Sequence, residues 1–131
     1  AGGIGTGAAV RAAVVAGADL CYMGTRFIAA FESIASEEYK RMVIEARYED
    51  LVLTDKVTGA KAYYLRQSLE KMGLDPQNID SGKGINLSDS QNQIRAWKDV
   101  WSAGHGVGAV KTRESLATII SQLHYEYRLA C

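Results

Sequence analysis

Two short glycine-bearing segments are the residues best suited to hold an anion. Gly2 and Gly3 stand at the start of the chain, and Tyr22-Met23-Gly24-Thr25 follows later. Glycine has no side chain to keep a ligand away, so consecutive backbone N–H groups can turn toward one anion. The pair predicts a divided phosphate site, and the alternative is that both segments are tight turns that packing alone requires.

The residues between these segments indicate which elements would position them. Val10, Ala13 and Val14 fall on one face at helical spacing, and Gly17 is well placed to end that helix. Residues 19–23 read as a short buried strand with Gly24 at its carboxyl end. Anions bind at that end of strands in α/β folds, and the last two strands of a (β/α)8 barrel commonly provide a phosphate site. We therefore expect residues 1–35 to be the last βα units of such a barrel, carrying the phosphate-binding turns.

Composition excludes several other kinds of protein. The 131 residues suffice for one modest domain, and an apolar fraction of 47% is ordinary for a globular chain. Lys plus Arg and Asp plus Glu both number 15, so nothing in the charge favours nucleic acid or an anionic membrane as partner. No apolar stretch approaches the roughly 20 residues of a membrane span, and no secretory leader is seen, so a cytoplasmic location is expected. Two cysteines, Cys21 and Cys131, suit neither a disulfide framework nor a metal cluster, and Cys21 is expected to be a small core residue.

The start of the chain is unusual for an α/β protein. Gly2 and Gly3 would form the turn after a strand that is not present. A (β/α)8 barrel needs about 250 residues. We therefore expect the chain to be roughly the C-terminal half of a longer protein, or a truncated form of one.

The middle of the chain, residues 36–95, is expected to be a small inserted domain, largely helical with a polar loop. Ser36 can cap a helix whose first turn carries Glu37 and Glu38. Further elements expected here are strands at 50–54 and 60–64, a helix at 65–72 ended by Gly73, and a loop or partly disordered stretch at 75–92.

Residues 96–131 are expected to return to the barrel and end in a C-terminal helix. Ile94, Trp97 and Trp101 share one helical face, which favours a core role for both tryptophans. A glycine loop over 102–108 follows. The last helix is expected to carry an apolar stripe and to be capped by Thr112; the stripe comprises Leu116, Ile119, Ile120, Leu123 and Tyr127.

Three polar residues near the glycine segments each leave two roles open. Thr25 could bind phosphate through its hydroxyl or cap the following helix. Arg26 could pair with phosphate or serve as a structural or solvent-facing cation. His105 could be a loop histidine satisfied by backbone groups or a catalytic one.

Motifs distributed along nearly the whole chain resemble those of the nitronate monooxygenases, formerly called 2-nitropropane dioxygenases. They are Ala1-Gly2-Gly3-Ile4, Gly17-Ala18-Asp19, Met23-Gly24-Thr25-Arg26-Phe27, Glu32-Ser33, Tyr39-Lys40, Thr54 with Gly59, and residues 101–108. The resemblance implies an FMN-dependent (β/α)8 barrel with a small inserted domain. It also implies oxidation of alkyl nitronates by molecular oxygen to carbonyl compounds and nitrite. The implied partners are a small-molecule nitronate and oxygen. A homodimer is a further expectation.

The resemblance also implies which residues touch the cofactor. In that family backbone amides of the two glycine turns hold the FMN phosphate. Carried over by position, these residues are Gly2, Gly3, Tyr22, Met23, Gly24 and Thr25. The family usually has glutamine at the positions of Tyr22 and His105. Its catalytic histidine lies upstream of the matched region, so the resemblance assigns no catalytic residue and no metal ligand to this chain.

Two other readings are kept beside this one. Flavin-dependent enoyl-acyl-carrier-protein reductases carry similar glycine turns, which makes an enzyme of that kind the nearest alternative. The chain could also be an inactive fragment that lacks the catalytic half, because half a barrel exposes open sheet edges and an uncovered apolar face.

Overall fold

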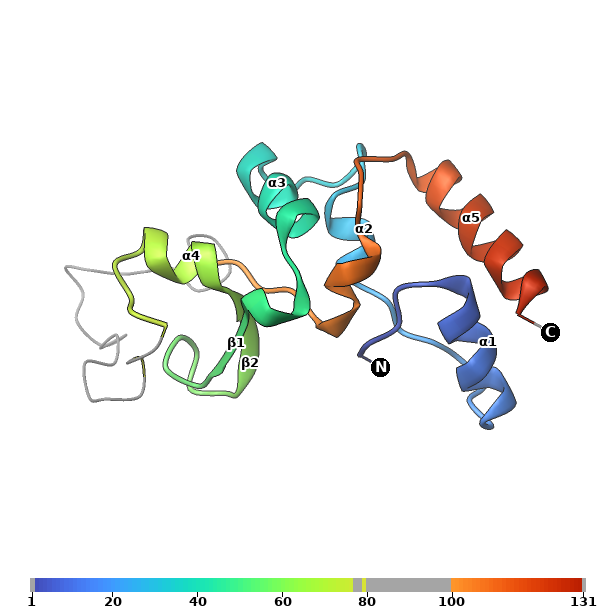
Figure 1. Ribbon diagram of the computed structural model, residues 1–131, viewed down its shortest axis with the longest axis horizontal. Coiled ribbons are helices and arrows are strands. Elements are labelled where there is room, and N and C mark those ends of the chain that lie inside the picture. Colours follow the sequence, from blue (N-terminus) through green and yellow to red (C-terminus); the bar gives the residue numbers. More distant parts are fainter. Residues whose placement is uncertain (1, 77–78, 80–99, 131) are drawn as a thin grey trace. The chain divides into compact units, whose positions relative to one another are not determined.

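The computed structural model describes residues 2–76, 79 and 100–130, and the chain has an α/β fold (Figure 1). It divides into two compact units. The first comprises Ala1–Tyr48 with Gly104–Cys131, and the second comprises Glu49–Ala103. The inserted domain predicted over 36–95 is wider than the second unit, because residues 37–45 lie in the first unit.

Helices make up the regular structure described in the first unit. They are α1 (Gly7–Val15), α2 (Thr25–Ile28), α3 (Glu37–Glu45), the 3-10 helix η2 (His105–Ala109) and α5 (Leu116–Leu129). Another 3-10 helix, η1 (Tyr48–Asp50), spans the boundary between the units.

Short polar side chains begin three of these helices. Thr6, Ser36 and Ser115 each accept a hydrogen bond from a backbone N–H in the first turn of α1, α3 and α5. The sequence-based prediction of Ser36 as a cap is confirmed. The prediction of Thr112 is wrong, because the last helix begins three residues later, where Ser115 can reach the N–H of Thr118.

Helices α1 and α5 lie side by side, although they come from opposite ends of the sequence (Figure 1). Gly7 permits the contact, since a Cβ there would overlap the carbonyl oxygen of Leu123. The backbone N–H of Gly7 also donates to Oε2 of Glu126 at 2.6 Å. The carboxylate of Glu126 on α5 thus lies at the N-terminal, positive end of the α1 dipole and stabilises it.

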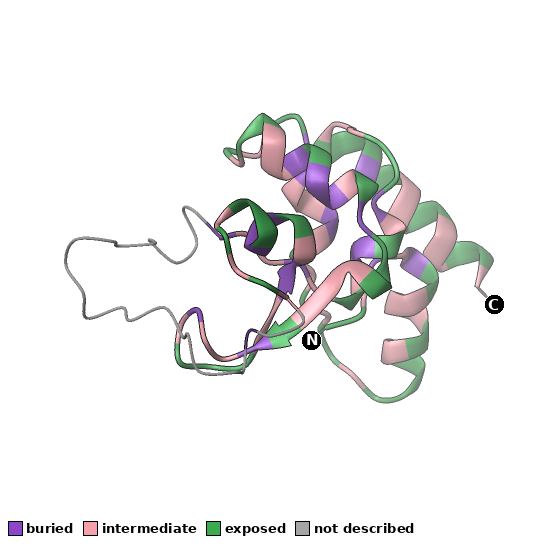
Figure 2. Ribbon diagram, turned by 60° about the vertical axis from the view of Figure 1, so that its left-hand side comes forward, coloured by how far each residue is buried: buried purple, intermediate pink, exposed green. Residues whose placement is uncertain are grey.

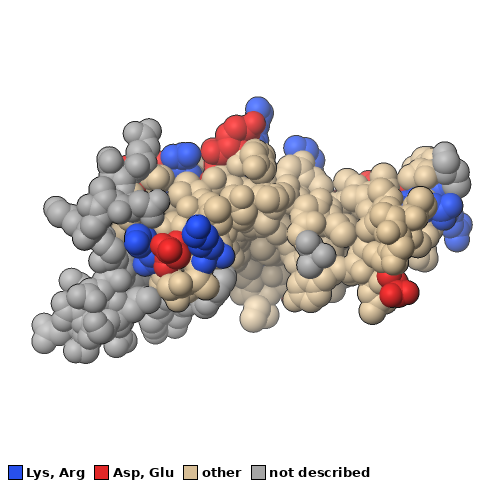
Figure 3. Space-filling model, turned by 90° about the horizontal axis from the view of Figure 1, so that it is seen from below, with Lys and Arg blue, Asp and Glu red and all other residues tan. Residues whose placement is uncertain are grey.

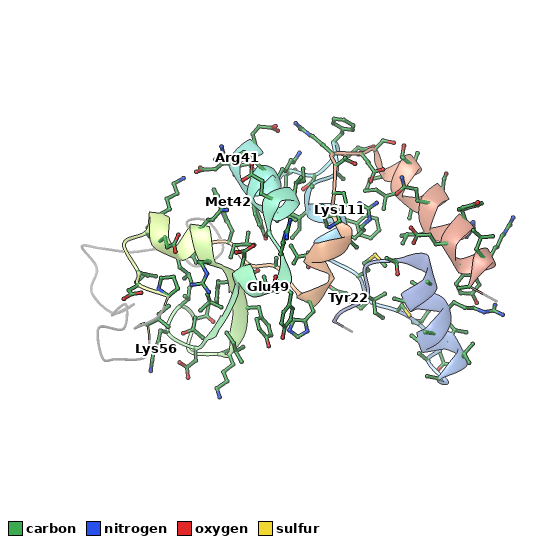
Figure 4. All side chains as sticks on the ribbon, in the orientation of Figure 1. Tyr22, Arg41, Met42, Glu49, Lys56 and Lys111 are labelled. Carbon is green, nitrogen blue, oxygen red and sulfur yellow. The ribbon has the colours of Figure 1, made fainter. Side chains whose placement is uncertain are left out.

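Helix α3 is amphipathic. Figure 2 shows buried residues next to exposed ones along the helices, and Figure 4 labels two neighbours on α3, Arg41 and Met42. Met42 and Val43 are buried, whereas Arg41 is exposed. Burial of such an apolar stripe is what holds a helix of this length in place.

The strand predicted over 19–23 is not present. Residues 18–24 form neither helix nor strand, and Leu20 and Tyr22 are 90% and 78% exposed. A strand satisfies its backbone N–H and C=O groups through a neighbouring strand, and no such neighbour is found for this segment in the described chain. Cys21 is half-buried, so its predicted place in the core is also wrong.

The second unit is built on an antiparallel hairpin. Strand β1 (Leu51–Thr54) pairs with β2 (Ala62–Leu65), with Leu51 opposite Leu65 and Thr54 opposite Ala62. In the connecting turn Gly59 has φ +80°, a left-handed conformation that glycine adopts freely. Helix α4 (Arg66–Lys71) follows directly, and both predicted strands and the predicted helix are confirmed in type.

The segment that contains Trp101 runs beside β2. Leu65 donates its backbone N–H to the carbonyl oxygen of Trp101 at 2.9 Å, and Trp101 donates its own N–H to Oγ of Ser68 at 2.7 Å. This part of the predicted helix is therefore extended, whereas Ile94, Trp97 and most of the predicted 75–92 loop lie outside the described residues. The buried apolar core of the unit comprises Val57, Tyr64, Leu69, Ile79 and Val100.

Candidate site at two glycine turns

The first glycine turn needs glycine for its own backbone. Gly2 and Gly3 have φ values of +85° and +70°. L-residues with a side chain rarely adopt this left-handed region, so the absence of a Cβ is a conformational requirement at both positions. Both residues are exposed, and a Cβ on either would meet no atom within 4 Å.

The second turn has no such requirement. Gly24 has φ −116° and ψ −56°, values that any residue adopts, and a Cβ there would also meet no atom within 4 Å. Neither backbone geometry nor packing explains a glycine at this position. An external group that approaches the backbone closely would explain it. Gly108 on η2 likewise has no positive φ, and a Cβ there would meet no atom within 4 Å. It therefore serves as a reference for substitutions at Gly24.

Tyr22 and Met23 can each offer a backbone N–H to a ligand bound at this turn. Tyr22 lies in the irregular segment between α1 and α2, and its ring is mostly exposed (Figure 4). The side chain of Met23 instead lines an apolar pocket of about 520 Å³. The main-chain N–H groups of Tyr22 and Met23 can therefore donate to an anion at this turn.

Thr25 contacts the glycine loop that follows Trp101. Its Oγ1 accepts a hydrogen bond from the backbone N–H of Gly104 at 2.8 Å. Neither of the two roles left open by the sequence included this contact. The hydroxyl hydrogen of Thr25 is still a donor, because a hydroxyl both donates and accepts.

Helix η2 lies beside both glycine turns. A Cβ on Gly106 would stand 3.3 Å from the carbonyl oxygen of Ile4, and one on Gly5 would meet Ala109 at 2.8 Å. At the other end, Gly104 is bonded to Thr25, and η2 packs against α2. The structure thus brings the first and second turns to a common segment, as Figure 1 shows for η2 and α2.

Arg26, the neighbour of Thr25, is a structural cation. Only 7% of the residue is exposed. Its Nη2 donates to Oε2 of Glu114 at 2.7 Å and to Oε1 of Gln122 at 2.8 Å, and Nε2 of Gln122 donates to Oε1 of Glu114 at 2.6 Å. The hydrogen bond from Arg26 lowers the pKa of the Glu114 carboxyl, and this outweighs the burial that would raise it. The sequence left the role of Arg26 open. It did not indicate Glu114 or Gln122 as partners, because they lie 88 and 96 positions from Arg26.

The two histidines do not lie in a common cluster. The exposed ring of His105 lies 5.3 Å from that of Tyr48, measured between centroids. His124 lines the apolar pocket with Cys21 and Met23. Within the described ranges no three His, Cys, Asp or Glu residues are grouped to hold a metal ion.

The charged side chains on the face drawn in Figure 3 occur singly or in small mixed groups. This distribution agrees with the formal net charge of zero and gives no support for an extended anionic partner. None of the helices in the described part of the chain is long and apolar enough to cross a membrane.

Comparison with known proteins identifies the family. Over 98% of its length the chain is 26% identical to a nitronate monooxygenase of Paraburkholderia phytofirmans, of which it spans 37%. Among solved structures it matches FabK from Thermotoga maritima with a TM-score of 0.69 and 26% identity, covering 98% of this chain and 43% of that one. It matches nitroalkane oxidase from Streptomyces ansochromogenes with a TM-score of 0.68 and 25% identity, covering 98% and 38%. The family model for nitronate monooxygenase matches residues 1–124. The chain therefore belongs to the nitronate monooxygenase family.

Proposed function

We propose that this chain supplies the FMN-phosphate site of a flavin-dependent oxidoreductase built on a (β/α)8 barrel. The activity proposed for the whole enzyme is oxidation of an alkyl nitronate by molecular oxygen to a carbonyl compound and nitrite. Family membership supports the reaction class. Our predictions also include an inserted domain over 36–95, a cytoplasmic location and a homodimer.

The observation that carries the proposal is the glycine at position 24. Its backbone conformation and its open surroundings would accept a larger residue in the protein alone. A phosphate approaching the N–H groups of residues 22–25 would not, because a side chain would stand in its path. The open backbone at this turn supports the proposal of a phosphate there.

The first turn complements it through its backbone. In helix α1 the N–H of Gly7 is bonded to Glu126 and the N–H of Ala9 to Thr6. These amides are not available to a ligand, so we assign the phosphate to Gly2 and Gly3 of the first turn. With the second turn, the proposed site comprises Gly2, Gly3, Tyr22, Met23, Gly24 and Thr25.

Bound FMN would supply the redox chemistry, while the protein determines where the cofactor sits. Tyr22 and Met23 contribute main-chain donors, since one ring is exposed and the other side chain faces the apolar pocket. Thr25 contributes its N–H and its hydroxyl hydrogen, and its oxygen holds Gly104. The chain's own residues thus bind and orient the phosphate end of the cofactor.

An enoyl-acyl-carrier-protein reductase-like flavoenzyme is the second candidate. The chain is almost as similar to nitroalkane oxidase as to FabK, with TM-scores of 0.68 and 0.69 and identities of 25% and 26%. The phosphate site would be the same in both cases, so the reaction must be distinguished by substrate.

Cofactor binding is tested by quenching of FMN fluorescence with the purified protein. Wild-type protein should quench, Gly24→Val should bind FMN much more weakly, and Gly108→Val is the matched control, since its surroundings are equally open. Equal binding by wild type and Gly24→Val would contradict the site. Nitrite release from propionate 3-nitronate would support the nitronate reaction, and NADH oxidation coupled to an enoyl thioester would support the second candidate.

A further inference from the structure

Helix α2 depends on other parts of the first unit for its position. It has four residues, and Gly24, which precedes it, makes no side-chain capping hydrogen bond. Isolated helices much longer than this are marginal in water. The geometry of the Gly24–Thr25 turn must therefore come from the groups to which α2 is attached.

Three attachments hold α2 and the residues that follow it. Thr25 is bonded to Gly104, as described above. The second attachment lies after the helix and comprises two contacts. The N–H of Phe31 donates to the carbonyl oxygen of Glu114 at 3.0 Å, and the carboxylate of Glu32 accepts from the N–H of Leu116. The third attachment is the side chain of Arg26, and it is the most buried of them.

The Arg26 attachment is a closed triangle of charge-assisted hydrogen bonds. One guanidinium nitrogen donates to both Glu114 and Gln122, and the Gln122 amide in turn donates to the other carboxylate oxygen. The side chains of Arg26 and Glu114 are only 8% and 16% exposed. Such pairs are stronger and geometrically more exact than neutral ones.

Because Nη2 of Arg26 is engaged in this triangle, this nitrogen is poorly suited to bind a phosphate directly. A phosphate on its Nη2 would have to displace Glu114, which would leave a carboxylate largely buried without its partner. The residue can still control the turn, since it follows Thr25 immediately.

We propose that Arg26, Glu114 and Gln122 act together as positioning residues that hold the Gly24–Thr25 turn in the conformation that receives the flavin phosphate. This inference rests on the proposed function, because it assumes the phosphate site at that turn. It adds that residues of α5 and the segment before it determine phosphate affinity without touching the phosphate.

Comparison of FMN with riboflavin, which lacks the phosphate, isolates this effect. The Kd of each flavin is measured by fluorescence quenching for the wild type, Arg26→Lys and Glu114→Gln. We expect FMN affinity to fall roughly tenfold in both variants, the factor typical of losing a hydrogen bond to a charged group, and riboflavin affinity to stay unchanged. Arg41→Lys is the matched control, because Arg41 is exposed on α3 in the same unit.

A milder variant keeps the test usable if the first two do not fold. Gln122→Met removes both of the glutamine's hydrogen bonds but keeps the Arg26–Glu114 pair and nearly the same volume. It should lower the preference for FMN over riboflavin in the same direction, by a smaller factor. Thermal unfolding of each variant shows that the protein measured is folded.

The outcomes separate the inference from the function on which it rests. Loss of FMN affinity alone supports the positioning role. An unchanged ratio of the two Kd values, or equal weakening of both flavins, overturns it and leaves the phosphate site in place. A wild-type protein that binds FMN no better than riboflavin overturns the proposed site and this inference with it.

Discussion

The two glycine turns use the same residue type for different reasons. In the first turn the backbone itself demands glycine, since Gly2 and Gly3 are left-handed. In the second, Gly24 has an ordinary conformation and open surroundings. The motif alone does not distinguish these cases, whereas φ and the space around the missing Cβ do.

The difference teaches where a functional requirement can be recognised. A glycine that folding requires will be retained whether or not a ligand binds, so it says little about function. A glycine that folding does not require leaves room for an external group, and Gly108, which is equally open, is the reference that tests this argument. The supports of the two turns also differ. Close backbone packing at Gly7 and its hydrogen bond to Glu126 hold α1, whereas a buried ionic triangle holds α2.

The largest expected effect is at the anchor of the first turn. Gly7→Ala should lower the free energy of unfolding by about 3 kcal/mol, at the upper end of the usual overpacking cost, because the new Cβ meets backbone rather than a movable side chain. Urea denaturation measures this change. Gly108→Ala makes the same substitution in open space and should be nearly neutral; a similar loss in both variants would contradict the packing argument.

The anchor of the second turn should show a pH dependence. Glu114→Gln should lower the free energy of unfolding by about 2 kcal/mol at neutral pH, the scale of a hydrogen bond to a charged group. Arg26 lowers the pKa of Glu114 in the folded protein, so the stabilisation is complete above the ordinary glutamate pKa of about 4.3 and is lost as the pH falls through the lowered value. Glu114 lines a polar pocket together with Lys111 and Glu126, and these two charged groups are unchanged in this variant.

Denaturation of the wild type and Glu114→Gln at pH 7 and at pH 3 measures the difference. The gap between the two proteins should be wide at pH 7 and narrow in acid. A gap of equal size at both pH values would mean that the charge of Glu114 does not stabilise the fold.

Within the first turn a smaller effect is expected from backbone strain. Gly3→Ala should lower the free energy of unfolding by about 1–2 kcal/mol, the cost of a left-handed conformation for an L-residue. Gly3→Asn should cost less, since asparagine tolerates that region better. Equal losses for alanine and asparagine would indicate a cause other than φ.

The smallest effect on stability is expected at the second turn. Gly24→Ala should change the free energy of unfolding by no more than about 0.5 kcal/mol, as for an ordinary surface substitution, while FMN binding weakens. Thermal unfolding and flavin titration of the same preparation give both quantities. A stability loss as large as that of Gly3→Ala would remove the contrast between the two turns.

Local signals in the sequence predicted several helix ends, although not the start of α5. Ser36 caps α3, and Gly17 and Gly73 end their helices with positive φ, since a capping hydroxyl or a left-handed glycine acts within a few residues. The hairpin was also predicted, because its strands are joined by a short turn with glycine at position 59.

Features that depend on distant partners were missed. Periodicity placed Trp101 on a helix, but its backbone pairs with Leu65 and Ser68 instead. Residues 19–23 have strand-like composition and no strand beside them in the described chain. For the candidate site, the sequence identified the glycines, and the triangle around Arg26 required the fold.

Where α1 and α5 cross, Gly7 is hydrogen-bonded to Glu126, a residue 119 positions away. Removing α5 would expose the apolar side of α1 and leave the Gly7 amide without its carboxylate. A split version of the protein follows from this, in which α5 is supplied as a separate peptide to a chain that ends before Leu116. Recovery of the α1 fold on addition of the peptide would serve as a complementation assay. Because Gly7 lies directly against the backbone at Leu123, a larger residue at position 7 should prevent this recovery.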